Sequence, residues 1–298
     1  MKKISIIITT HNSARHIGPC LDSIFSQSFK DHEIIVIDNA SEDTTREIAR
    51  NKYPGIILIE NNMNYGISKA WNQGIARAQG NYICCINDDV RLESDFLANI
   101  YRAIEGDASV GAVQPKVLQP DGRHMDTAGI TLSFLRRFYD IGSGQENGNG
   151  YDIKKYIFGA CDAAVIYRRK ALAAVRQAGE YFDEDFFCLV EDVDLSWRMQ
   201  KAGWKALYCP DAICTHYRGL SRKRNAFTQY LNMRNRYLMI LKNESALGFL
   251  RFLFVFLAYD IWRMLYMAAV HPRYCLKALV DTLRLSPRMA EKRWTIRA

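Results

Sequence analysis

ICCINDDV, residues 83–90, joins an apolar run to three oxygen-bearing side chains, Asn87, Asp88 and Asp89. The run has the composition of a buried β-strand, so we expect a sheet to pass through it. An unpaired carboxylate is too costly to bury in an apolar core. The three polar residues therefore form a turn, a helix cap or a binding site at the end of this strand.

Strand and helix patterns alternate through the first ninety residues. Apolar runs lie at 5–9, 33–38, 56–60 and 81–87, and amphipathic helical patterns lie at 13–27, 43–51 and 66–78. Runs without polar alternation are typical of parallel strands covered on both faces. Ser13 and Ser41 are expected to cap the first two helices. The pattern predicts a doubly wound α/β half, and the sequence contains neither a GxGxxG turn nor a P-loop.

The whole chain is long enough for one large domain with an appendage, since 49% of its 298 residues are hydrophobic. Beyond residue 90 the patterns predict helices at 94–105, 170–178 and 191–204 and strands at 110–117 and 155–169. The eight cysteines include no CxxC pair, and the apolar run at the N-terminus is too short for a secretory signal. We therefore expect a reducing cytosol, with the cysteines acting as small core residues.

Charge is distributed unevenly along the chain. From Tyr217 onward 16 Lys and Arg residues stand against four Asp and Glu, which leaves −4 of the net +8 for residues 1–216. A mildly acidic body with a basic, apolar-rich tail favours a membrane surface over a nucleic acid as the partner.

The tail is expected to be helical from about Ser221. Residues 245–270 are apolar but carry Arg251, Asp260 and Arg263, and their uninterrupted run is far shorter than the roughly 20 residues that span a bilayer. This pattern favours a helix lying in the membrane interface, followed by a second basic helix at 273–285. Packing on the body or in a homodimer, or a spanning helix, are the alternatives.

Polar residues follow each of the first four predicted strands. The clusters are 9–12, 38–41, 61–64 and 87–89. Each alone is explained by a turn or a helix cap, but the carboxyl ends of parallel strands meet at one edge, where ligands bind in open α/β sheets. A shared site therefore explains the four clusters better than four separate turns.

Five motifs along the chain, in order, resemble those of family 2 glycosyltransferases with the GT-A fold. The motifs are IITTHN (7–12), VIDNASEDTT (36–45), NxNxGxxxxxNxG (62–74), INDDV (86–90) and EDVDLSWR (191–198). The nearest likeness is to the bacterial rhamnosyltransferase-like branch that builds surface polysaccharides, over about residues 4–216. The resemblance implies a GT-A catalytic domain, a Rossmann-like α/β mixed sheet, at 1–220. Residues 221–298 would then form a basic, amphipathic helical tail that associates with a membrane.

The resemblance also implies which residues bind the nucleotide of a UDP- or dTDP-sugar. Asp38 would accept hydrogen bonds from the base, Thr9 would line its pocket, and His11 would stack on the pyrimidine where many relatives have Tyr or Phe. Lys69 could supply the positive charge that relatives place at the position of Trp71, which is expected to be a core residue. The remaining nucleotide-binding residues are Asn12, Asn64, Asn72 and Asp88.

A nucleoside diphosphate leaving group favours a divalent cation, Mn²⁺ or Mg²⁺, with oxygen ligands. The acidic metal motif of the family falls on Asn87, Asp88 and Asp89, with Asp89 as the principal ligand and Asn87 a departure from Asp-x-Asp. His216 matches a histidine that resembles a third metal ligand, although a lone histidine after a strand is more often structural.

An inverting transfer needs one base to take the proton from the acceptor hydroxyl. The resemblance places it at Asp192, with Glu191 or Asp194 positioning the site, although acidic residues also suit any helix start. Arg198 is expected to pair with a carboxylate one turn away. The residues assigned to the acceptor or the donor sugar are Asp162, Glu191 and Trp197.

The predicted reaction is metal-dependent, inverting transfer of a rhamnose-like sugar or a hexose to a hydroxyl of a lipid-linked glycan. The acceptor would be a polyprenyl-diphosphate-linked oligosaccharide, which confines the enzyme to the cytoplasmic face of the inner membrane as a peripheral protein. A nucleotidyltransferase is the first alternative, but it needs a glycine- and lysine-rich loop that residues 11–20 lack. An inactive sugar-binding scaffold is the second, and intact Asp38, Asp89, Asp192 and His216 argue against it.

Overall fold

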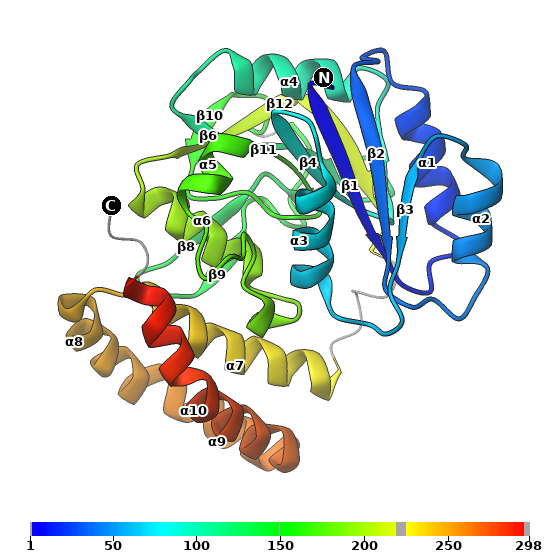
Figure 1. Ribbon diagram of the computed structural model, residues 1–298. Helices are drawn as coiled ribbons and strands as arrows, with labels where there is room; N and C mark the ends of the chain where they lie inside the picture. The colour runs from blue at the N-terminus through cyan, green and yellow to red at the C-terminus, as the bar shows by residue number, and fades with distance from the viewer. Residues whose placement is uncertain (1, 149, 219–224, 295–298) are drawn as a thin grey trace.

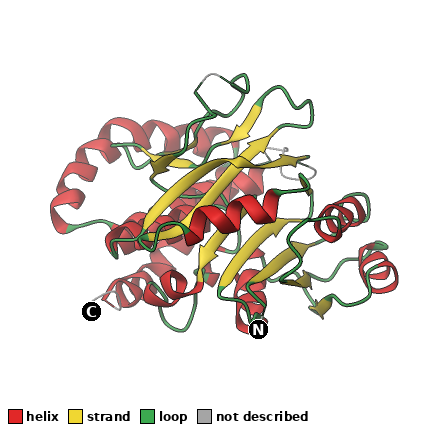
Figure 2. Ribbon diagram, turned by 90° about the horizontal axis from the view of Figure 1, so that it is seen from above, coloured by secondary structure: helices red, strands yellow, loops and turns green. Residues whose placement is uncertain are grey.

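The computed structural model describes residues 2–148, 150–218 and 225–294. A mixed sheet of ten strands in this part of the chain has helices on both of its faces (Figures 1 and 2). Its main path runs β10-β12-β6-β11-β4-β1-β2-β3, while β5 pairs with β12 and β7 with β6. The α/β fold class expected from the sequence is therefore confirmed.

The first half of the chain is the predicted parallel unit. It consists of β1 (Ile4–Thr10), α1 (Ile17–Phe25), β2 (His32–Asp38), α2 (Thr45–Lys52), β3 (Ile57–Glu60), α3 (Ile67–Arg77) and β4 (Tyr82–Asn87). The strand pairs β1–β2, β1–β4 and β2–β3 are all parallel, so four carboxyl ends share one edge of the sheet. Trp71 on α3 is fully buried in the core, as expected.

Two helices begin later than predicted. The residues before α1 and α2 are His16 and Thr44, and neither Ser13 nor Ser41 caps a helix with its side chain. Ser41 instead donates its hydroxyl to Asp38, and the backbone N–H of Ser13 donates to the Thr45 hydroxyl at 2.8 Å. The segments that were expected to start helices are therefore loops that cross-link the strand ends.

The second half of the body adds antiparallel and irregular strands. It consists of β5 (Val90–Leu92), α4 (Phe96–Glu105), β6 (Val110–Leu118), β7 (Met125–Thr127), β8 (Ile130–Leu132), β9 (Phe138–Asp140), β10 (Lys155–Ile157), β11 (Ala164–Arg168), α5 (Arg169–Ala174), η1 (Glu184–Phe186), α6 (Glu191–Lys201) and β12 (Lys205–His216). The prediction of a single strand at 155–169 is wrong, because this range contains the two strands β10 and β11. Between β10 and β11 the chain leaves the sheet, and Gly159 exchanges two backbone hydrogen bonds with Ile130.

In the described residues from 225 to 294, four helices and a short π-helical segment follow the body. They are α7 (Ala226–Asn243), α8 (Ala246–Val255), η2 (Phe256–Asp260), α9 (Ile261–Val270) and α10 (Pro272–Trp294), seen below the sheet in Figure 1. Val193 and Trp197 of α6 share an apolar cluster with Leu238 of α7 and Met289 of α10. Within the described ranges, no helix combines the length and apolar character needed to cross a bilayer.

Buried ion pairs fasten α7 and α10 to the body. Lys242 is fully buried and contacts Asp183 at 2.7 Å and Asp194 at 2.8 Å. Lys292 of α10 contacts Asp183 and, at 2.9 Å, Asp185. Because breaking a buried pair leaves an uncompensated charge, these contacts hold the tail helices in one arrangement on the body.

Candidate active site

The first four strand ends meet at a cavity of about 330 Å³. Its walls come from the loop after β1, the ends of β2 and β4, the loop after β3 and a distant segment that precedes α6. The lining residues are Thr9, Thr10, His11, Asn12, Ser13, His16, Asn39, Asn64, Gly66, Ile67, Asn87, Asp88, Asp89, Phe187 and Cys188. Seven of the predicted site residues, Thr9, His11, Asn12, Asn64, Asn87, Asp88 and Asp89, are therefore brought together here.

The loop after β1 is tied to the end of β2. The Nδ1 of His11 lies 2.8 Å from the carbonyl oxygen of Asn39, and the Asn12 carboxamide accepts from the backbone of Glu42 at 2.8 Å. Asn12 has a φ of +53°, a region where Asn is less strained than most residues. The His11 ring and the Asn12 turn are thus held at the cavity wall by backbone groups.

Three predicted nucleotide-binding residues lie outside this lining. Asp38 is fully buried and accepts from the Ser41 backbone and hydroxyl, with Arg46 at 3.6 Å. Lys69 lies over the Tyr65 ring, 4.3 Å from its centroid. Asp38 ends β2, and its carboxylate binds the turn at Ser41 instead of facing the cavity lining.

Asn72 forms hydrogen bonds with the backbone of a distant segment of the chain. Its carboxamide oxygen accepts from the backbone N–H groups of Tyr181 and Phe182, and its Nδ2 donates to the Phe182 carbonyl at 2.8 Å. These bonds fix the segment that leads into η1. The structure thus gives Asn72 a positioning contact and does not place it in the cavity lining.

Asp89 and His216 meet, although 126 residues separate them in the sequence. His216 ends β12, which pairs antiparallel with β5, so its Nε2 lies 3.1 Å from Oδ1 of Asp89. Its Nδ1 lies 2.8 Å from Asp126, a residue that the sequence reasoning missed. Burial would lower the pKa of His216, but hydrogen bonds to Asp126 and Asp89 raise it to about 9.

This arrangement fits a divalent cation. A carboxylate oxygen and an imidazole nitrogen face each other, and a second carboxylate fixes the other ring nitrogen, as is common for metal-binding histidines. Arg218 in turn donates to Asp126. Burial raises the pKa of Asp88 to about 7, and the charge of Asp89 adds to the shift. Asn87 also lines the cavity beside them.

A second acidic cluster surrounds the start of α6. Ligand atoms of Cys161, Asp162 and Asp192 lie within 4.8 Å of one another. Burial, followed by the charges of Asp162 and Asp140, raises the pKa of Asp192. Burial also raises the pKa values of Glu191 and Asp162.

The acidic cluster is better suited to proton transfer than to metal binding. Burial raises the pKa of the Cys161 thiol well above its ordinary value, and a protonated thiol is a poor ligand for a hard cation. Oδ2 of Asp162, Oε2 of Glu191 and Nε1 of Trp71 are buried without a hydrogen-bond partner among the described residues. Asp162 interacts with both Glu191 and Trp71, so these groups lie together at a place where a further polar ligand can bind.

The segment before Asp192 is held in an uncommon backbone conformation. Phe187, Leu189 and Val190 have φ values of +67°, +69° and +77°, which is costly for residues with a side chain and most of all for a β-branched one. Nδ2 of Asn235 on α7 donates to the carbonyls of Phe186, Cys188 and Leu189 at 2.7–3.0 Å. The tail helix α7 therefore shapes this wall of the cavity.

The same segment explains one glycine of the predicted motif. Gly66 has a φ of +83°, and a Cβ placed there would lie 2.4 Å from the carbonyl oxygen of Phe187. The backbone of the loop after β3 can approach Phe187 this closely only without a side chain.

Trp197 and Asp194 form other contacts than those expected for the site. Trp197 packs in the apolar cluster between α6 and α7, with the Arg136 guanidinium 5.3 Å from its ring centroid. Asp194 accepts from Arg198 at 2.9 Å and from Lys242, so the expected pairing of Arg198 with a carboxylate is confirmed. Asp194 therefore anchors α7 and does not position the acidic cluster.

Several residues of the two clusters carried no readable signal in the sequence. Asp126 and Asp140 lie on β7 and β9, two three-residue strands that the sequence patterns did not predict, and the pairing of β7 with β6 and of β9 with β8 positions them. Phe187 and Asn235 belong to no recognisable pattern. Glu191 and Asp192, by contrast, lie together at the helix start as the motif predicts.

Comparison with known proteins identifies a family and several relatives that this chain resembles. Residues 5–176 match the family model described as Glycosyl transferase family 2. The N-acetylglucosaminyl-diphospho-decaprenol L-rhamnosyltransferase of Mycobacterium tuberculosis (strain ATCC 25618 / H37Rv) is 25% identical over 247 residues, which are 74% of this chain and 78% of that protein. Glycosyltransferase GlyA of Streptococcus pneumoniae serotype 4 (strain ATCC BAA-334 / TIGR4) is 32% identical over 114 residues, 37% of this chain and 16% of GlyA.

A solved structure has the same fold. Mannosyltransferase PcManGT from Pyrobaculum calidifontis, in complex with GDP-Man and Mn²⁺, superposes with a TM-score of 0.59 at 18% identity. The superposition covers 99% of this chain and 84% of that one, so it includes the C-terminal helices. The fold is the GT-A fold, as the sequence predicted.

Proposed function

The chain belongs to glycosyl transferase family 2, and we propose that it transfers a sugar, with inversion, from a UDP- or dTDP-sugar to a hydroxyl of a lipid-linked glycan. The observation that carries this proposal is the pair of clusters. The Asp89–His216 pair lies beside the cavity at the strand ends, and the Asp162–Glu191–Asp192 group lies at the start of α6, just after the segment whose Phe187 and Cys188 line the cavity. A donor diphosphate and an acceptor hydroxyl need two such places.

The donor nucleotide would occupy the cavity of about 330 Å³. That volume lies at the lower end of the range for small-molecule sites, and the lining offers backbone and amide groups for orientation. Thr9, His11, Asn12, Asn64 and Asp88 would contact the nucleotide directly. Asp38, Lys69 and Asn72 would act through neighbouring residues, since their side chains are not in the lining.

Asp89 and His216 would hold a Mn²⁺ or Mg²⁺ ion, with Asn87 as a weaker third ligand. The bound ion would offset the negative charge that develops on the nucleoside diphosphate leaving group. The histidine nitrogen favours Mn²⁺ over Mg²⁺, since magnesium sites use oxygen almost exclusively. Asp126 would keep the His216 ring oriented.

Asp192 would be the base. Its raised pKa makes its carboxylate a stronger proton acceptor than an exposed aspartate. The acceptor oxygen bonds to the anomeric carbon as the bond to the diphosphate breaks, and the hydroxyl proton passes to the Asp192 carboxylate. Asp162 and Glu191 would accept hydrogen bonds from sugar hydroxyls through the oxygens that lack partners in the described chain.

The tail supports a membrane-linked acceptor. Its described helices expose large apolar side chains, namely Leu247, Leu250, Leu253, Phe254, Leu257, Trp262, Leu265, Val270, Leu276, Val280 and Leu283. The mycobacterial relative carries diphospho-decaprenol in its name. We therefore place the protein peripherally on the cytoplasmic face of the inner membrane. Residues 1–220 would be its catalytic domain and residues 221–298 its membrane-associating tail.

Donor binding and turnover test this function separately. UDP- and dTDP-sugars are screened with Mn²⁺ for an increase in melting temperature, because a ligand that binds the native state stabilises it. Asp89→Ala should lose the metal-dependent increase. Asp192→Asn should keep it but lose turnover by about 10²- to 10⁴-fold. Unchanged turnover in Asp192→Asn would show that the base lies elsewhere.

A further inference from the structure

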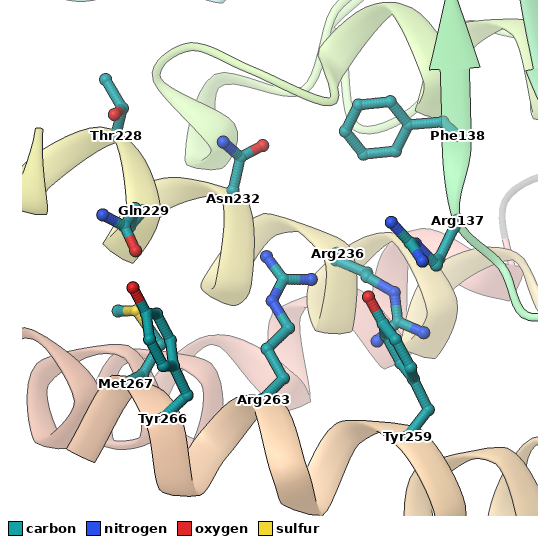
Figure 3. Close-up of a pocket in the computed structure, with 10 residues that line it drawn as sticks. All are labelled: Arg137, Phe138, Thr228, Gln229, Asn232, Arg236, Tyr259, Arg263, Tyr266 and Met267. Atoms are coloured by element: carbon teal, nitrogen blue, oxygen red, sulfur yellow. The ribbon is translucent and has the colours of Figure 1, made fainter. Parts of the chain in front are cut away.

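A second cavity, of about 470 Å³, lies between β9, α7 and α9, away from the donor cavity (Figure 3). Its lining residues are Arg137, Phe138, Thr228, Gln229, Asn232, Arg236, Tyr259, Arg263, Tyr266 and Met267. Arg263 rises from α9 toward Asn232 and Arg236 on α7, and Arg137 stands over the Tyr259 ring. We call this space the arginine cavity. Among the described residues, its lining contains three guanidinium groups and no carboxylate.

Positive charge is in excess around the arginine cavity. Nη1 of Arg236 lies 2.7 Å from both oxygens of the buried Asp260, and its other nitrogens donate to the carbonyls of Leu135 and Arg136. Arg137 and Arg263 form no ion pair with any residue in the described ranges. Three guanidinium groups thus share one carboxylate, which leaves two positive charges.

The surroundings of Arg263 disfavour the positive charge of its guanidinium. Burial, and then the charge of Arg236, lowers its pKa. A guanidinium in such surroundings is expected to pair with an anion, since planar, multiply hydrogen-bonded recognition of phosphate suits arginine better than lysine. Asn232 and Gln229 add amide donors to the same space.

The arginine cavity opens beside the apolar face of the tail. Tyr266 lines the cavity and is 59% exposed, and its neighbours Trp262 and Leu265 are 72% and 56% exposed. A ligand that combines an anionic head with a long apolar chain would satisfy both surfaces. A soluble anion would leave these side chains in water.

One strand connects the arginine cavity with the acidic cluster. Phe138 lines the cavity, and Asp140 lies two residues further along β9 on the same face, about 7 Å away. The charge of Asp140 raises the pKa of Asp192, after burial and Asp162. Strand β9 therefore runs from the lining of the arginine cavity to a residue whose charge acts on the proposed base.

We infer that the arginine cavity holds the diphosphate of the lipid-linked acceptor, with Arg137 and Arg263 as its phosphate-binding residues. This inference rests on the proposed function, because it requires an acceptor of that kind. The diphosphate is held between β9 and α9, the first sugar extends along β9 toward Asp192, and the lipid chain leaves over Trp262 and Leu265.

Binding of a short polyprenyl diphosphate tests the inference without catalysis. Calorimetry measures the affinity of the full chain for farnesyl diphosphate in EDTA, so that no metal holds a phosphate in the donor cavity; farnesol is the control without a diphosphate. The variants are Arg137→Gln with Arg263→Gln, and as a matched control Arg273→Gln with Arg284→Gln, two exposed arginines of α10. Donor-induced stabilisation checks that both variants are folded.

The cavity variant should bind farnesyl diphosphate at least about tenfold more weakly, and the α10 variant should bind it as the wild type does. Farnesol should bind equally weakly to all three. Equal affinity in the two variants, or an equal loss in both, overturns the inference.

Vesicles of phosphatidylcholine with and without phosphatidylglycerol distinguish the acceptor from a lipid headgroup. The two variants should bind phosphatidylglycerol vesicles alike. A different outcome is that the cavity variant alone binds phosphatidylglycerol vesicles more weakly while its affinity for farnesyl diphosphate is unchanged. In that case the cavity binds a phospholipid headgroup and the inference fails.

Transfer assays separate the inference from the proposed function. In one outcome, the wild type transfers sugar to a polyprenyl-diphosphate-linked acceptor while the cavity variant has the same acceptor KM. This result refutes the role of the arginine cavity in acceptor binding and leaves the proposed function intact. In another outcome, the wild type binds farnesyl diphosphate through Arg137 and Arg263 but transfers no sugar to any such acceptor. This result supports the diphosphate site in the arginine cavity and refutes the proposed function.

Discussion

Replacing Asn235 should damage both stability and turnover, although the residue touches neither proposed substrate. Its side chain is fully buried on α7, and its amide donates to three carbonyls of the segment that precedes Asp192. Phe187 and Cys188 of that segment form a wall of the donor cavity. Asn235→Ala removes these hydrogen bonds and leaves buried carbonyls without a donor.

The loss can be sized from the contacts. One amide group has two N–H donors, so it forms about two full hydrogen bonds with the three carbonyls, each worth about 0.5–1.5 kcal/mol net. A buried carbonyl that finds no water costs about 1–3 kcal/mol more. The free energy of unfolding should therefore fall by about 2–4 kcal/mol, which lowers the melting temperature by about 4–8 °C. A chain of this size should still fold.

Urea unfolding and steady-state kinetics measure the two effects. The donor KM should rise and kcat should fall, because the cavity wall and the start of α6 both lose their support. Asn235→Asp, which keeps the shape and removes the donors, should be at least as damaging. Asn99→Ala is the control, since Asn99 donates one hydrogen bond to the Asp211 carbonyl on another part of the surface. Unchanged stability and kinetics in Asn235→Ala would refute the reasoning.

Three further predictions concern single charges. Asp162→Asn removes a negative neighbour that raises the pKa of Asp192, so the acid limb of the pH–kcat/KM profile should move to lower pH; a shift to higher pH contradicts the assignment. Asp126→Asn should weaken Mn²⁺ binding by about 10- to 100-fold through His216, as measured by calorimetry, and unchanged affinity would exclude His216 as a ligand. Lys242→Met removes one of two cations from each of two buried aspartates, since Asp183 keeps Lys292 and Asp194 keeps Arg198, so chemical denaturation should show a loss of about 3 kcal/mol, the low end of the range for a broken buried pair; a loss below about 1 kcal/mol would show that Lys292 and Arg198 alone compensate these aspartates.

Local sequence patterns were sufficient for the sheet and for one edge of the site. Continuous apolar runs require strands buried on both faces, and helices between them require parallel pairing, so four polar strand ends had to meet. Asn12, Asn64 and Asp88 reach one cavity for that reason. The helix starts at Ser13 and Ser41 were not predictable, because the Ser13 backbone is held by the distant Thr45 hydroxyl and the Ser41 hydroxyl donates to Asp38 at the end of β2 instead of capping a helix.

The tertiary structure alone decided which distant groups act together. Hydrogen bonds from Ser41 hold the Asp38 carboxylate outside the cavity lining, and an antiparallel pairing brought His216 to Asp89. The tail illustrates the same point. Its composition predicted apolar helices with three charges, but only packing turned Asp260 and Arg263 toward α7 and left the apolar side chains outside. A sequence records spacing along a chain, whereas a site depends on distances across it, and those are set by how whole elements pack.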